Sequence, residues 1–263
     1  MKPGFQPVRR NRKIGTPAQG HGTSNTLTIP TSRHREQIWW EVTHQPVVQT
    51  IVVGSSTILF LIDPPFDGFQ HALLPRDICN LLAQLPNQDW HGIGCFYLRQ
   101  STRKQRIISP TWGRISFWAQ LGNGLTPDLY EGPAILLEAF NSENAIRWSR
   151  SLTLDDQVEL DRLRQDGHRI TEEKRSFRIE ASLQAFRTTQ LLRTIPHEIG
   201  HWVDWKQRVE IPSTDKSADY GALVDGYWSR PASEREAFAH RYADSFRRSL
   251  SKSAADSILN SVN

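Results

Sequence analysis

The sequence has few cysteines and no long apolar run. Only Cys79 and Cys95 occur among 263 residues. Two are too few for a disulfide framework or a cysteine-based metal site, so we expect reduced, buried thiols. No apolar stretch approaches the roughly 20 residues that span a membrane, and the N-terminus lacks the apolar core of a Sec signal peptide. These absences predict a protein that stays in the cytoplasm or is exported by a route without such a signal.

Acidic residues are missing from the first 35 positions, which carry seven of the 32 lysines and arginines. The other 25 basic residues face 28 acidic ones, so the rest of the chain has a net charge of −3, although the whole chain has +4. With its prolines and glycines, segment 1–36 is typical of a disordered basic tail. Such a tail could contact nucleic acid or an anionic surface, but apart from Phe5 it lacks aromatic residues that would stack on bases.

Residues 37–263 are expected to form one domain, because a chain of this length can bury a full core. Apolar patterns predict strands first, over about 45–145, and helices later, over about 150–263, which indicates an α+β fold. The expected strands are Val47–Val53, Thr57–Ile62, Gly92–Leu98, Ile115–Leu121 and Ala134–Phe140, and the expected helices include Arg76–Leu85 and Thr153–Gln165.

The motif His197-Glu-Ile-Gly-His201 carries the strongest functional signal. Helical residues four apart lie on one face, so the two imidazoles can bind a single metal ion. Glu198 is turned about 100° away, where its carboxylate can reach a water molecule beside the metal. This is the layout of a zinc hydrolase, and we expect one Zn²⁺ per chain.

Two residues of this helix need an explanation. Pro196 removes a backbone donor and clashes with the carbonyl of Leu192. Either a preceding helix ends and Pro196 opens a new one, or one long helix kinks here. Gly200 costs a helix roughly 1 kcal/mol relative to Ala, which indicates a close backbone approach.

A catalytic zinc needs a third protein ligand. The stretch from Pro231 to Asp244 is predicted to be helical, with Phe238, Tyr242 and Phe246 as its core stripe. Glu236 lies beside that stripe and is the first candidate ligand. His240, one turn later, is an alternative, and Asp215 or Asp219 are further ones.

The two motifs together resemble a known family. His197-Glu-Ile-Gly-His201-Trp-Val-Asp204, with Glu236-Ala-Phe-Ala-His-Arg-Tyr242 downstream, is similar to the gluzincin metallopeptidases, in particular the anthrax lethal factor and Pro-Pro endopeptidase group. The resemblance covers roughly residues 183–246. It implies a zincin-like fold with an active-site helix and a glutamate helix, and it implies that Glu236 is the third zinc ligand.

The chain departs from that family at two positions. His240 stands where the group often has Glu, and Ser229 stands where the group has a Tyr that helps to stabilise the oxyanion. Tyr227, and less favourably Tyr220, are near enough in sequence to substitute for that Tyr. Asp204 could accept a hydrogen bond from a ligand imidazole, or it could be a helix-end carboxylate near Lys206 and Arg208.

These residues predict a zinc-dependent endopeptidase that cleaves a protein substrate. Zinc polarises the substrate carbonyl and lowers the pKa of water to about 7, and Glu198 acts as the general base. The substrate is expected along an edge strand, with Gly113–Leu121 and Ala134–Phe140 as candidates. The alternative is a regulatory or binding protein on the same scaffold, whose basic tail contacts nucleic acid. The sequence leaves the oligomeric state open.

Overall fold

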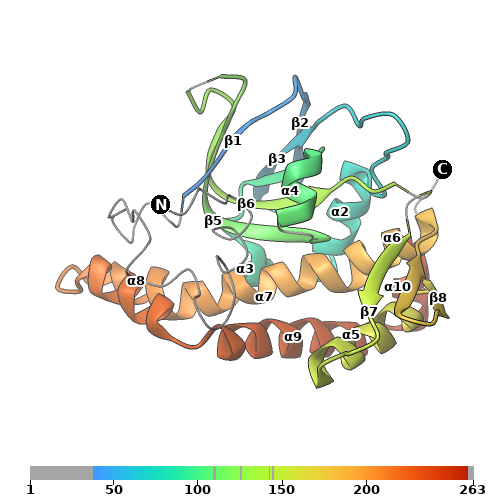
Figure 1. Ribbon diagram of the computed structural model, residues 1–263. Coiled ribbons are helices and arrows are strands. Elements are labelled where there is room, and N and C mark those ends of the chain that lie inside the picture. The colour runs from blue at the N-terminus through green and yellow to red at the C-terminus, as the bar shows by residue number, and fades with distance from the viewer. Residues whose placement is uncertain (1–37, 109–110, 125, 142, 144, 260–263) are drawn as a thin grey trace, which may run out of the picture. The chain divides into compact units, whose positions relative to one another are not determined.

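A mixed six-stranded sheet lies above the helix that carries the His197–His201 motif (Figure 1). The structure is a computed structural model that describes residues 38–108, 111–124, 126–141, 143 and 145–259. The basic tail predicted over 1–36 lies outside the described residues. The order of strands is β1-β5-β6-β4-β3-β2. The strands are β1 Ile38–Val42, β2 Val47–Val53, β3 Ser56–Ile62, β4 Cys95–Arg99, β5 Gly113–Gly122 and β6 Tyr130–Glu138.

The sheet combines parallel and antiparallel pairs. β1 runs parallel to β5, while β4 runs parallel to both β3 and β6; the β2–β3 and β5–β6 pairs are antiparallel. Along β4, Phe96 and Leu98 join the core that also contains Ile195 and Ile199, whereas Cys95 and Tyr97 join the core of the opposite face. This alternation follows from the two-residue period of a strand. The predicted α+β class with a mixed sheet is therefore confirmed.

A second, smaller sheet has the order β7-β9-β8. It packs through Ile179 against Leu160 and Leu163 of helix α5. The bounds are β7 Ile146–Ser149, β8 Arg169–Glu172 and β9 Ser176–Glu180. The α-helices are α2 Pro75–Leu82, α3 Asn87–Trp90, α4 Arg103–Ile108, α5 Leu154–Gln165, α6 Leu183–Thr189, α7 Ile195–Trp205, α8 Tyr220–Ser229, α9 Ala232–Ser249 and α10 Lys252–Leu259.

Helix α7 carries the histidine motif and lies between the large sheet and α9 (Figure 1). Its apolar face buries Ile195, Ile199 and Trp202 in the main core. Trp202 and Trp205 are both almost fully buried, and both stack near Phe117 of β5. These tryptophans therefore pack α7 against the sheet.

Pro196 does not start a separate helix. The chain runs without a break from α6 through the π-helical turn Gln190–Thr194 into α7. In this turn the Ile195 N–H donates to the Gln190 carbonyl, five residues back. The wider turn removes the need for the backbone bond that Pro196 cannot make, so one long helix accommodates the proline through a π-bulge.

Several expectations need correction. Of the predicted stripe on α9, only Phe246 is fully buried; Phe238 and Tyr242 are half-buried, and Ala239 and Ala243 take the central positions. Small residues are required there because α9 packs closely on α7. The strand predicted over Ala134–Phe140 is also not an edge strand, because β6 pairs with β4 on one side and β5 on the other.

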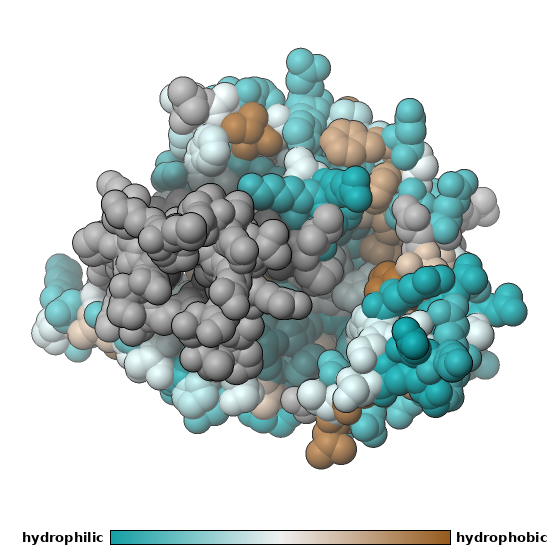
Figure 2. Space-filling view, in the orientation of Figure 1, coloured by the Kyte–Doolittle hydropathy of each residue, from teal (hydrophilic) through white to brown (hydrophobic). Residues whose placement is uncertain are grey.

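None of the described helices combines the length and the apolar character that a membrane span requires. Figure 2 shows the exposed apolar side chains on this face as separate spots within a largely hydrophilic surface.

Candidate metal centre

His197 and His201 project from the same face of α7, as their spacing predicts. Their Nε2 atoms are 3.1 Å apart, and their rings meet nearly at right angles. Both side chains are largely buried, with exposed fractions of 14% and 12%. Two imidazole nitrogens thus converge on one point at the border of the core.

Glu236 of α9 lies against both imidazoles. One carboxylate oxygen is 3.3 Å from His197 Nε2, and the other is 3.6 Å from His201 Nε2. Hydrogen bonds from the two histidines hold the pKa of the Glu236 carboxyl well below its ordinary value, although burial acts in the opposite direction. Of the candidates for a third ligand, Glu236 is the one that the structure places beside the histidine pair.

The spacing of these donor atoms suits a tetrahedral ion. Bonds of roughly 2.0–2.1 Å to a tetrahedral zinc would separate any two ligand atoms by about 3.3–3.4 Å. The observed separations are 3.1, 3.3 and 3.6 Å. His197, His201 and Glu236 could therefore hold a metal ion with little rearrangement.

Gly200 explains why Glu236 reaches the histidines. A Cβ atom on Gly200 would lie 2.9 Å from the Ala239 Cα and 3.0 Å from the Tyr242 Cβ. The absence of a side chain lets α9 approach α7 closely, and Glu236 lies one turn before Ala239 on the side of the motif. The predicted close backbone approach at Gly200 is confirmed.

Glu198 contacts the sheet through one carboxylate oxygen. Its Oε2 atom accepts a hydrogen bond of 2.8 Å from the Ile115 backbone N–H of β5. Burial raises the pKa of the Glu198 carboxyl, while the neighbouring His197 and His201 and the Ile115 bond lower it. A buried carboxylate with a raised pKa is suited to accept and return a proton.

His240 is a neighbour of the histidine pair without converging on it. Its ring centroid is 4.5 Å from that of His197, and its Nδ1 atom is 3.2 Å from Arg162 Nη1 of α5. Because Arg162 can only donate, Nδ1 must accept, which leaves the proton of a neutral imidazole on Nε2. Burial, with the nearby His197 and Arg162, lowers the pKa of His240 to about 4.

Asp204 is fully buried beyond the second histidine. One oxygen accepts from Arg208 Nε at 2.9 Å and the other from Arg230 Nη1 at 2.7 Å. The bond to Arg230 ties the end of α7 to the turn between α8 and α9. The His197 Nδ1 atom, which an outer acceptor would contact, has no partner among the described residues.

The remaining candidates are two tyrosines and two aspartates. Tyr227 is buried in an aromatic cluster with Phe117 and Trp205, where burial raises the pKa of its phenol. Tyr220 is half-exposed at the start of α8. Asp219 caps α8 by accepting from the Ala222 N–H, and Asp215 accepts from Ser217. Asp215 and Asp219 are not among the described groups whose donor atoms converge with the histidines, whereas a role of Tyr227 or Tyr220 at the oxyanion stays a prediction.

A cleft of about 650 Å³ opens beside His197 and Glu236. Its walls come from the start of β5, from α5, from the π-turn with α7, and from α9. They include Trp112 and Gly113, Glu159 and Arg162, Arg193 and Thr194, and Ser233 and Ala237. A space of this size admits several residues of an extended peptide.

Reasoning from the sequence missed three features of the site: the Ile115 N–H, Arg162 and Arg193. Arg193 could have been noticed as one helical turn before His197, but Arg162 and Ile115 reach the site only through tertiary packing. No family model, no curated protein and no solved structure matches this chain. The interpretation of the site therefore rests on its own geometry and on the motif resemblance.

Proposed function

We propose that the protein is a zinc-dependent endopeptidase with a zincin-like arrangement. The observation that carries the proposal is the convergence of His197 Nε2, His201 Nε2 and the Glu236 carboxylate within bonding reach of one point. Two imidazoles and one carboxylate are a ligand set of catalytic zinc. The gluzincin resemblance of the two motifs supports the same reading.

Zinc, when bound, would supply Lewis acidity, polarising a carbonyl and making water more acidic. The protein's own contribution is to handle the proton. Glu198 takes a proton from the attacking water and delivers it to the leaving amine. Its raised pKa favours this exchange, and the Ile115 N–H keeps the carboxylate in a fixed orientation.

The substrate would lie along the first half of β5. β1 pairs with β5 only from Trp118 to Gly122. Among the described residues, no strand pairs with this side of β5 from Gly113 to Phe117, and Gly113 lines the cleft. An extended peptide could add to this edge by backbone hydrogen bonds, close to Glu198.

Metal analysis of the purified protein, followed by a cleavage assay, tests the proposal. The wild type should carry one zinc ion per chain and should generate new termini in a proteome-derived peptide library, with the cleavage suppressed by a chelator. Glu198→Gln should keep the zinc and lose turnover by about 10³–10⁴-fold, the upper range for a general base. His201→Ala should lose the metal.

A natively folded protein without metal would contradict the proposal, and so would equal cleavage by the wild type and Glu198→Gln. The regulatory alternative depends on residues 1–35, which lie outside the described part of the chain. It stays a prediction, to be checked by salt-dependent retention on DNA with and without that segment.

A further inference from the structure

Strand β2 forms one end of the large sheet, and its outer side has no paired strand among the described residues. It pairs with β3 on its other side and is the last strand in the order β1-β5-β6-β4-β3-β2. An edge strand presents a row of backbone N–H and C=O groups to its outer side, and these groups can pair with another extended chain. The edge of β2 is therefore a candidate interaction surface.

This edge lacks the features that commonly protect an exposed strand. Segment Val47–Val53, with the sequence VVQTIVV, has seven residues and contains neither a charged residue nor a proline. Each of its residues faces one residue of β3, so no β-bulge turns the edge away. The opposite edge strand, β1, has five residues and carries the charged Glu41. An uncharged edge of the length of β2 is either covered by a partner or prone to aggregation.

Exposed valines lie on both faces of β2. Val48 and Val52 point to one face of the sheet and are 50% and 68% exposed. Val47 points to the other face and is 58% exposed, whereas Val53, further along that same face, is buried in the main core. A strand added to this edge would cover these side chains, because directly opposite residues of paired strands contact each other.

The pattern of β2 suits a second copy of itself. The sequence VVQTIVV begins and ends with two valines, and Thr50 lies at its centre. When two copies pair antiparallel about a two-fold axis at Thr50, each Val48 lies opposite the partner's Val52. Pairs of β-branched residues are favourable across strands. On the other face, the exposed Val47 lies opposite the partner's Val53 and extends the main core across the axis.

The charge distribution also favours a second copy over a charged peptide. Residues 45–62, which contain both β2 and β3, include no Asp, Glu, Lys or Arg. A charged peptide would therefore find no counter-ion along this edge, and burying its charge would be costly. A second copy of β2 brings no charge, and its side chains match those that it meets.

We propose that β2 is the interface of a homodimer, in which two copies pair antiparallel through Val47–Val53 and join their sheets. The proposal does not depend on the peptidase function. In the sheet order β5 is four strands from β2, or roughly 19 Å at the usual strand spacing, so each copy keeps its own cleft open. Seven paired residues per chain make a small interface, and we expect dissociation in the micromolar range.

Sedimentation velocity of the full chain at about 1–100 µM tests the dimer. The wild type should change from 30.2 kDa to twice that mass as the concentration rises. Val48→Lys with Val52→Lys should stay monomeric, because every new lysine would lie opposite another lysine. Val48→Lys with Val52→Glu should restore the dimer, because the two-fold register sets each lysine opposite a glutamate.

The matched control changes two exposed apolar side chains outside the large sheet. Leu154 and Ile211 are 79% and 59% exposed, and the double variant Leu154→Lys with Ile211→Lys should dimerise like the wild type. Because all the substituted side chains are exposed, the variants should keep the fold. Circular dichroism verifies that they do.

A crosslinking experiment tests the register directly. Thr50→Cys sets two thiols opposite each other at the axis, where paired Cα atoms are about 4.5–5.5 Å apart and within reach of a disulfide. Val48→Cys separates the two thiols by about four residues, or roughly 13 Å along the strand, which is too far. Mild oxidation should therefore give covalent dimers of Thr50→Cys only. The wild type, with its half-buried Cys79 and buried Cys95, measures the background.

Four results would overturn the proposal. The first two are a wild type that stays monomeric at about 100 µM and a dimer that survives the two lysines. The other two are a monomeric Val48→Lys, Val52→Glu variant and a Val48→Cys variant that crosslinks as well as Thr50→Cys, because either would contradict the two-fold pairing. None of these measurements involves zinc or cleavage, so the dimer and the peptidase function stand or fall separately.

Discussion

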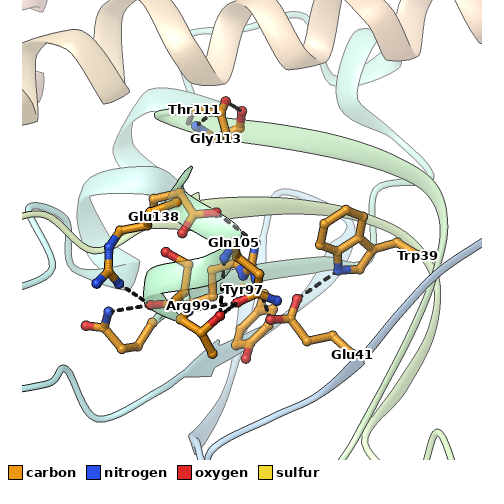
Figure 3. A network of polar contacts seen from close by, with 12 residues as sticks. Trp39, Glu41, Tyr97, Arg99, Gln105, Thr111, Gly113 and Glu138 are labelled. Carbon is orange, nitrogen blue, oxygen red and sulfur yellow. Dashed lines mark hydrogen bonds and ion pairs between the residues drawn. The ribbon is translucent and has the colours of Figure 1, made fainter. Parts of the chain in front are cut away.

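Two clusters of charged side chains lie on opposite faces of the large sheet, and they differ in one respect that decides their roles. On the face away from α7, Arg99 of β4 binds Glu41 of β1 at 2.5 Å and Glu138 of β6 at 2.7 Å. Figure 3 shows Arg99 between these two carboxylates, with Trp39 beside Glu41. On the α7 face, His197 and His201 meet Glu236.

The first cluster is closed to solvent. Arg99 is 1% exposed, and the two glutamates are 7% and 8% exposed. The cation lies between its acceptors, with Trp39 stacked within 5.3 Å of the guanidinium. The second cluster consists of groups that bind metal ions, and its glutamate side chain is 54% exposed beside the cleft.

The comparison shows that buried charge alone does not mark a functional site. A buried ion group whose partners are all protein side chains fixes the strands of a sheet and contributes little beyond that. A group whose donor atoms converge on a point with no protein atom, at the side of a cavity, is arranged for a ligand. Each cluster can be broken separately.

The largest effect on stability is expected from Arg99→Met. This change would leave Glu41 and Glu138 buried without their cation, and breaking a buried ion group in this way costs roughly 3–5 kcal/mol. Urea unfolding followed by tryptophan fluorescence measures the loss. The triple change Arg99→Met, Glu41→Gln and Glu138→Gln should recover most of it. Wild-type stability of the single variant would contradict the structural role.

The corresponding substitution in the second cluster is Glu236→Gln. It should lower zinc affinity by at least about 100-fold, since even outer-shell changes cost 10- to 100-fold, and it should leave the metal-free stability nearly unchanged because Glu236 is half-exposed. Competition with a chromogenic zinc chelator measures the affinity. Glu234→Gln, two residues earlier on α9, is the control and should bind zinc normally.

Gly200→Ala tests whether the close packing of α9 on α7 positions Glu236 at the metal site. The new Cβ would lie 2.9 Å from the Ala239 Cα, so α9 must move, at a cost of about 1–3 kcal/mol. Zinc affinity should fall together with the free energy of unfolding, because Glu236 moves with α9. Gly226→Ala in α8 is the matched control: nothing lies within 4 Å of its Cβ, and it should be neutral or slightly stabilising.

The smallest effect is a dependence of stability on pH from His168, next to Asp166. Its Nε2 atom contacts Thr189 Oγ1 at 2.8 Å, and Nδ1 has no partner among the described residues. Burial lowers the pKa of His168 to about 4. Between pH 4 and 6.5 the unfolded chain therefore binds more protons than the folded one, and stability is lost as the pH falls through this range.

His168→Gln keeps a donor near the Nε2 position but does not titrate. Relative to this variant, the wild type should lose on the order of 1–2 kcal/mol of unfolding free energy from pH 7 to pH 4. Thermal unfolding at a series of pH values measures the difference. Parallel curves for the two proteins would contradict the assignment.

Local patterns in the sequence predicted some of the helices and strands correctly. Strand β2 begins and ends where the apolar pattern predicts, and α5 begins one residue after its predicted start, Thr153, and ends at Gln165 as predicted. The short strand Ile38–Val42 and the small sheet of β7, β8 and β9 were not predicted, because they are four or five residues long and are stabilised by pairing with distant segments.

The sequence by itself determined the common face of His197 and His201, the offset of Glu198, and the need for a small residue at position 200, since helical spacing depends on neighbours within two turns. Only the tertiary structure decided that Glu236 rather than His240 places its donor atoms beside both histidines, that Arg162 binds His240, and that Tyr227 packs against Trp205. These outcomes depend on how α5, α8 and α9 pack on α7. The contacts that decide them join residues 26 and 78 positions apart, and no local pattern encodes how such segments pack.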